Sequence, residues 1–212
     1  MVLKCSRWLD LIDYSLYLVT ARYDYSDDKF LNIIEQACQA GVTLVQLREK
    51  SGTTREIFRL ATLVKKITDK YHIPLIIDDR VDICLAVDAA GVHIGDDELP
   101  VDLVRSLIGP NKILGVSAKT IDRSIEAQKQ GASYLGVGAI FPTTTKVKTC
   151  HTSLETLRKI LDYVDIPVVA IGGIKTYNVK QFSGMNIAGV AVVSEIMQSD
   201  NVADTVQKLK DY

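Results

Sequence analysis

One short segment of the chain reads QLREK and has the side chains of an anion-binding site. In an extended backbone its alternation places Gln46, Arg48 and Lys50 on one side and Leu47 and Glu49 on the other. Arginine binds phosphate through two parallel hydrogen bonds, and the lysine adds a second positive charge. The segment therefore predicts a clamp for a phosphorylated anion, and the alternative is a solvated charged loop.

Carboxylates gather after two later apolar runs. They are Asp78 and Asp79 in the first group and Asp96, Asp97 and Glu98 in the second. Mg²⁺ prefers such oxygen ligands, usually one or two carboxylates together with substrate phosphates. We therefore expect a magnesium site between the two groups. We also expect at least one carboxylate of the first group to cap a helix that begins near Val81.

Two further expected strands carry polar side chains. His93 alternates with apolar neighbours, which favours a hydrogen-bonded core histidine over a catalytic base. Ser117 and Lys119 supply a hydroxyl and a cation beside a helix N-terminus at Thr120, where anions are favoured. The alternative for Ser117 is a simple helix cap.

Hydroxyl groups and glycines mark the last three expected strand ends. The sequence GAIFPTTTK ends in three threonines and Lys146. Gly172 and Gly173 follow the next expected strand, and Val193 and Ser194 follow the last one. In barrels the last two loops commonly bind a phosphate through backbone N–H groups. We expect the QLREK clamp far round the ring from these loops. The pattern therefore predicts a second, metal-bound polyphosphate and a site that joins two phosphorylated compounds.

Eight short β-branched runs must position these groups. They span residues 16–20, 44–48, 75–78, 92–94, 113–117, 134–138, 168–171 and 189–193. Helical patterns follow, among them 29–39, 55–71, 101–108, 121–130 and 154–161. Eight such units in 212 residues predict a single-domain (β/α)₈ TIM barrel. A doubly wound open sheet is the alternative, but it usually places phosphate-binding glycines after its first strand, which here ends in VTAR.

The expected barrel domain covers residues 15–212. Residues 1–14 mix apolar and charged side chains, which predicts a short N-terminal amphipathic cap over one end of the barrel.

Composition limits the classes of partner. With 47% hydrophobic and 24% charged residues the chain is typical of a soluble globular protein, which excludes disorder, collagen and coiled coil. A net charge of −1 predicts no nucleic-acid partner and no membrane surface as a partner. The four cysteines lack zinc spacing, so we expect reduced thiols and a cytoplasmic protein.

Together the motifs resemble the thiamine-phosphate synthase family. They are QLREK, DRVD at 79–82, VHIG at 92–95, GVS at 115–117, GAIFPTTTK at 138–146 and AIGGI at 170–174. The resemblance implies a transferase that couples hydroxymethylpyrimidine pyrophosphate to hydroxyethylthiazole phosphate, giving thiamine phosphate and pyrophosphate. It also implies a dissociative mechanism, Mg²⁺ as cofactor and small molecules as partners, while association with a second copy of the chain stays open.

The resemblance also assigns roles to residues. It implies that Arg48, Lys50 and Ser117 hold the pyrophosphate and act in catalysis, and that Gln46 binds the pyrimidine beside Asp78. It implies that Asp79 and Glu98 bind magnesium. The thiazole phosphate would be bound by Thr143, Thr145 and Lys146, with the backbone near Gly173, Val193 and Ser194.

Four positions depart from the family pattern. This chain has Asp78 where the family usually has Asn, and Asp96 where it has Gln. It has Glu98 where the family usually has Asp, and Lys119 where it has His. Asp97 is the alternative to Glu98 as second metal ligand. The extra charge of Asp78 must be balanced by the metal or by a cation such as Lys119 or Arg80.

Two other functions compete with the transferase. A thiazole tautomerase-like isomerase would not need the clamp, so Arg48, Lys50 and Asp79 argue against it. A non-catalytic paralogue that binds thiamine phosphates is motivated by the changes at Asp78, Asp96 and Glu98.

Overall fold

The chain folds into a closed parallel barrel. The computed structural model describes residues 11–143 and 151–211. Its strands are β1 (Leu16–Val19), β2 (Leu44–Leu47), β3 (Leu75–Asp78), β4 (Gly91–Ile94), β5 (Ile113–Ala118), β6 (Tyr134–Val137), β7 (Val168–Ile171) and β8 (Gly189–Val192). They lie in chain order around the ring, and β1 closes it by pairing in parallel with β8, Leu16 opposite Val190. The predicted (β/α)₈ TIM barrel is confirmed.

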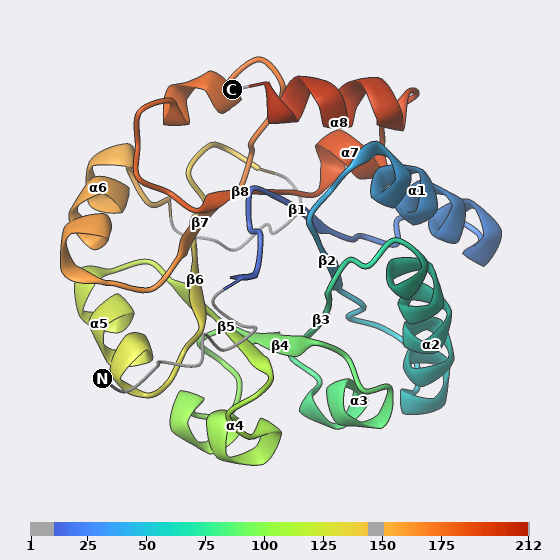
Figure 1. Cartoon of the computed structure of the whole chain (residues 1–212), viewed down its shortest axis with the longest axis horizontal. Helices are drawn as coiled ribbons and strands as arrows, with labels where there is room; N and C mark the ends of the chain where they lie inside the picture. The colour runs from blue at the N-terminus through green and yellow to red at the C-terminus, as the bar shows by residue number, and fades with distance from the viewer. Residues whose placement is uncertain (1–10, 144–150, 212) are drawn as a thin grey trace, which may run out of the picture.

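Helices form a ring outside the strands (Figure 1). They are α1 (Asp27–Ala40), α2 (Thr54–Lys70), α3 (Val81–Ala86), α4 (Val101–Ile108), α5 (Ile121–Lys129), α6 (Leu154–Tyr163), the 3₁₀ helix η2 (Val179–Phe182), α7 (Ser194–Met197) and α8 (Val202–Lys210). Side-chain caps fix several starts: Ser26 accepts from the Lys29 N–H before α1, and Thr53 with Glu56 forms a capping box before α2. Within the described chain, no helix is long and apolar enough to cross a bilayer.

The prediction that Asp78 or Asp79 caps α3 is wrong. The N-cap residue is Arg80, and no side chain makes a capping hydrogen bond there. Thr120 caps α5 by accepting from the Arg123 N–H, so Ser117 is not a helix cap either. These polar groups are therefore not used to begin the helices that follow them.

Apolar side chains pack in two layers separated by the strands. Alternate residues such as Val45 and Leu47 face outward against the helices, whereas Leu44 and Ile76 face the barrel interior. Two buried tyrosines, Tyr17 and Tyr134, occupy this interior. The barrel is therefore filled by side chains, and the space for a ligand lies at one end of it.

Only the end of the predicted N-terminal cap belongs to the described chain. The Tyr14 ring is buried, with its centroid 5.0 Å from that of Tyr134, whereas Leu11 is exposed. Residues 1–10 lie outside the described ranges, so the cap stays a prediction.

Candidate active site

A cavity of about 390 Å³ opens at the carboxyl ends of the strands. Its lining includes these predicted site residues: Gln46, Arg48, Lys50, Asp78, Asp79, Glu98, Ser117, Thr143, Gly173, Val193 and Ser194. Thr145 and Lys146 lie outside the described residues. The expectation that the clamp lies far round the ring from the last loops is wrong, because ring closure puts β2 next to β1 and β1 next to β8. Both predicted anion sites share one cavity.

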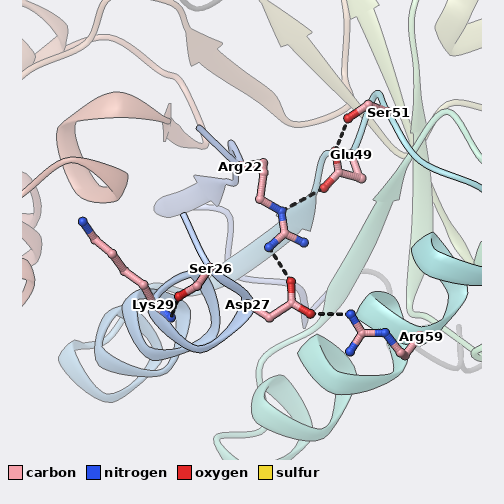
Figure 2. Close-up of polar contacts among 7 residues, drawn as sticks. All are labelled: Arg22, Ser26, Asp27, Lys29, Glu49, Ser51 and Arg59. Carbon is pink, nitrogen blue, oxygen red and sulfur yellow. Dashed lines mark hydrogen bonds and ion pairs between the residues drawn. The ribbon is translucent and has the colours of Figure 1, made fainter. Parts of the chain in front are cut away.

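The clamp segment alternates as the sequence predicts. Arg48 and Lys50 line the cavity, and the Arg48 N–H donates to Oγ1 of Thr20 at 3.0 Å. Glu49 faces the other way, where its carboxylate accepts from Arg22 Nε and from the Ser51 hydroxyl, both at 3.3 Å (Figure 2). The outward-facing acid thus ties the clamp to the segment that follows the neighbouring strand β1.

Arg22 also links Glu49 and the clamp to two helices. Its Nη1 lies 2.7 Å from Oδ1 of Asp27 at the start of α1, and Asp27 also pairs with Arg59 of α2 (Figure 2). The Arg22 guanidinium lies 4.5 Å from the centroid of the Phe30 ring as well. Sequence reasoning missed Arg22, although its position directly after β1 in VTAR was a usable signal.

The negative charge of Asp78 is balanced by cations other than the expected Lys119 or Arg80. Its Oδ2 lies 2.7 Å from Lys50 Nζ and 3.8 Å from Arg48 Nε. Lys119 instead lies 3.9 Å from Asp96, and Arg80 hydrogen-bonds Asp82. Burial raises the pKa of the Asp78 carboxyl and the neighbouring Asp79 charge adds to this rise, while Lys50 and Arg48 oppose it. The clamp cations are therefore already engaged by carboxylates.

Asp79 and Glu98 bring two carboxylates together on the rim of the cavity. Burial raises the pKa of Glu98, and the Asp79 charge raises it further. Asp79 adopts a left-handed backbone conformation with φ of 60° and also pairs with Lys50. Two mutually repelling carboxylates at a cavity rim are a donor set that a divalent cation fits.

A row of hydrogen bonds crosses the floor of the cavity. Gln46 Nε2 donates to the Tyr17 hydroxyl at 2.8 Å, and that hydroxyl lies 2.9 Å from the Tyr134 hydroxyl. His93 Nδ1 lies 2.9 Å from the same Tyr134 oxygen, and Nε2 lies 3.0 Å from Ser117 Oγ. His93 is thus hydrogen-bonded as expected, but it also faces the cavity. Sequence reasoning missed both tyrosines, which are indistinguishable from core residues in a strand pattern.

The loops after β7 and β8 form another part of the cavity wall, close round the ring to the clamp. Gly172 and Gly173 adopt φ of 99° and 66°, and a Cβ on Gly173 would lie 2.4 Å from the Pro142 carbonyl oxygen. The buried Asn178 holds this turn, because its Nδ2 donates to the Gly173 carbonyl at 2.9 Å. Only glycine fits this close approach without strain.

A lysine joins the two loops. Lys175 Nζ lies 2.9 Å from Ser194 Oγ and 3.1 Å from Glu195 Oε2. Glu195 in turn accepts from both the backbone N–H and the hydroxyl of Thr176. Sequence reasoning missed Lys175, Asn178 and Glu195, which act on the loop backbone and side chains from outside the cavity lining.

Fold and cavity together define a TIM-barrel enzyme with a polar, charged cavity at the carboxyl ends of its strands. Residues 16–196 match the family described as thiamine monophosphate synthase. The chain belongs to this family, and its reaction is the transfer that joins the pyrimidine and thiazole moieties of thiamine phosphate.

Relatives named thiamine-phosphate synthase are similar in sequence over nearly the whole chain. The chain is 64% identical to the thiamine-phosphate synthase of Enterococcus faecalis over 194 residues, which is 92% of each protein. It is 59% identical to that of Lacticaseibacillus paracasei over 202 residues, 95% of each. The solved thiamine phosphate pyrophosphorylase of Pyrococcus furiosus superposes with a TM-score of 0.85 at 36% identity, covering 94% of this chain and 95% of that one. These relatives favour the transferase over the isomerase and the non-catalytic paralogue.

Proposed function

We propose that the transfer is dissociative and that the clamp side of the cavity holds the leaving pyrophosphate. The observation that carries this proposal is that Arg48 and Lys50 line one cavity with the Asp79 and Glu98 carboxylates. Arg48, Lys50 and the Ser117 hydroxyl stabilise the negative charge that accumulates on the pyrophosphate as it departs. Gln46 binds the pyrimidine at the floor, beside Asp78.

The residues fit Mg²⁺, which would be held by Asp79 and Glu98, with Asp97 as the alternative to Glu98. Bound there, the ion supplies Lewis-acid stabilisation of pyrophosphate oxygens. The raised pKa of Glu98 beside Asp79 supports this assignment, since a cation would relieve the repulsion between the two carboxylates. Lys50 contacts both Asp78 and Asp79, so the pyrophosphate competes with these two carboxylates for its ammonium group.

The bond changes balance without a nucleophilic side chain. The bond between the pyrimidine methylene carbon and the pyrophosphate oxygen breaks, and its electron pair leaves with that oxygen. The thiazole nitrogen then donates its lone pair to the methylene cation, which forms the new carbon–nitrogen bond. The protein's task is to orient the two substrates and to exclude water from the cation.

The thiazole phosphate binds at the loops after β6, β7 and β8 in this proposal. Thr143, Ser194 and the backbone near Gly173 and Val193 line that part of the cavity. Thr145 and Lys146, outside the described residues, remain predictions. The free, buried thiols of Cys38 and Cys84 support the predicted cytoplasmic location.

Pyrophosphate release tests the proposal. Both substrates with Mg²⁺ should release pyrophosphate and form thiamine phosphate in equal amounts. The pyrimidine substrate alone should release it slowly and yield the hydroxymethylpyrimidine, because water captures the cation. Strict dependence of all pyrophosphate release on the thiazole substrate would contradict the dissociative order.

A further inference from the structure

Side chains from five strands form one continuous hydrogen-bonded row on the floor of the cavity. In order they are Gln46 of β2, Tyr17 of β1, Tyr134 of β6, His93 of β4 and Ser117 of β5. The first and last members are residues to which we assign contacts with the pyrimidine and the pyrophosphate. The proposed reaction gives no role to the three middle members, Tyr17, Tyr134 and His93.

The first bond favours one direction of donation along the row. Gln46 Nε2 can only donate, so the Tyr17 oxygen accepts from it, and in this direction the Tyr17 hydroxyl donates to the Tyr134 oxygen. The Tyr134 proton then goes to His93 Nδ1. In this direction the imidazole is neutral with its proton on Nε2 and donates that proton to Ser117 Oγ.

Burial supports this direction. Tyr17 is 2% exposed, Tyr134 0% and Gln46 4%, so water has little access to replace a partner in the row. Burial also raises the pKa of both tyrosine hydroxyls far above the usual range, so both keep the proton that they donate. If Tyr134 donated to Tyr17 instead, the buried Tyr17 hydroxyl proton would have no acceptor among its described partners.

We propose that Tyr17, Tyr134 and His93 are positioning residues that orient the groups at the two ends of this row. At one end they leave Gln46 Oε1 available to a hydrogen-bond donor on the pyrimidine. At the other end they leave the Ser117 hydroxyl proton available to the pyrophosphate. The inference rests on the proposed function, and it assigns His93 to orientation rather than to proton transfer.

The tautomer of His93 tests the direction of the row without substrate. In protein with ¹⁵N-labelled histidine, the His93 signals are assigned by their loss in His93→Asn among the 3 histidines of the chain. The wild-type ring should carry its proton on Nε2. In Tyr134→Phe the donor to Nδ1 is gone, so the ring should populate both tautomers. A wild-type ring protonated on Nδ1, or an unchanged ring in Tyr134→Phe, would overturn the proposal.

Kinetics test the effect on the reaction. Tyr134→Phe removes the hydrogen bonds of its hydroxyl to Tyr17 and to His93, so it should lower kcat about tenfold, while the KM for thiazole phosphate stays unchanged. Tyr71→Phe is the matched control, because its hydroxyl contacts Glu35 on the outer helices. Equal effects of these two substitutions, or an equal rise in KM for both substrates, would show that Tyr134 has a structural role only.

A second variant, Tyr17→Phe, tests the Gln46 end of the row separately from the Ser117 end. It should raise the KM for the pyrimidine substrate about tenfold, while the Tyr134 proton keeps the His93 tautomer unchanged. An unchanged KM would overturn the role at the Gln46 end. If the wild-type protein showed the predicted tautomer but released no pyrophosphate, the proposed function would fail and the proposed direction of the row would stand.

Discussion

Lys50 Nζ lies 2.7 Å from Oδ2 of Asp78, so a cation assigned to the pyrophosphate is held by a buried carboxylate next to it. The resemblance places Asn at position 78 in the family, where no such pair could form. Burial and Asp79 raise the pKa of Asp78, but Lys50 and Arg48 act against that rise. An incoming pyrophosphate must therefore compete with Asp78 for the clamp.

Arg48→Ala should lower turnover at least about a hundredfold, or about 2.7 kcal/mol of transition-state stabilisation. The lost guanidinium would otherwise stabilise charge on the departing pyrophosphate. Steady-state pyrophosphate release measures the effect, with Arg158→Ala on the exposed face of α6 as control. Near-normal turnover of Arg48→Ala would remove the clamp from the mechanism.

Asp78→Asn should retain activity and keep a magnesium requirement close to that of the wild type, whereas Asp79→Asn should abolish activity. The amide at 78 frees Lys50 from one ion pair, while the amide at 79 removes a proposed metal ligand. Rates across a magnesium titration compare the two variants. If Asp78→Asn is as inactive as Asp79→Asn, Asp78 itself binds the metal.

Arg22→Ala should lower the free energy of unfolding by about 1–2 kcal/mol and raise the KM for the pyrimidine substrate. The substitution removes the charged partner of Glu49, whose side chain is 11% exposed, and so loosens the clamp. Thermal unfolding and kinetics measure the two effects. Lys159→Ala, which loses only an exposed pair with Glu155, should change neither quantity.

Gly173→Ala should destabilise the protein and weaken binding of the thiazole phosphate, whereas Gly184→Ala should cost only backbone strain. Both glycines have positive φ, 66° and 77°, but a Cβ meets the Pro142 carbonyl oxygen only at Gly173. The shared strain is about 1–3 kcal/mol, so the difference between the variants isolates the clash. Equal stabilities and equal KM values would show that the turn does not depend on this close approach.

The strands could be predicted from sequence because each is a short run that alternates between two buried layers. The runs at 75–78 and 168–171 match β3 and β7, and Ser26 explains why α1 begins two residues earlier than its apolar pattern, at Asp27. The alternation in QLREK also predicted which side chains line the cavity.

Contacts across the barrel could not be predicted in the same way. The Tyr17 and Tyr134 hydroxyls meet across 117 residues of sequence, and only ring closure brings them together. Closure also brings the clamp near the last loops, which the linear order of the strands conceals. The ion partners of Asp78 depend on how far Lys50 and Arg48 reach, and periodicity carries no such information.

The balance of charge around the cavity affects how fast substrate arrives. Among the lining residues that the structure describes, the cations are Arg48, Lys50 and Lys119, and the acids are Asp78, Asp79, Asp96, Asp97 and Glu98. This excess of two negative charges repels an anionic ester during diffusional encounter, and dissolved salt screens the repulsion. Without divalent cations, the association rate of the pyrophosphate ester should therefore rise with ionic strength, opposite to the behaviour of a purely basic site.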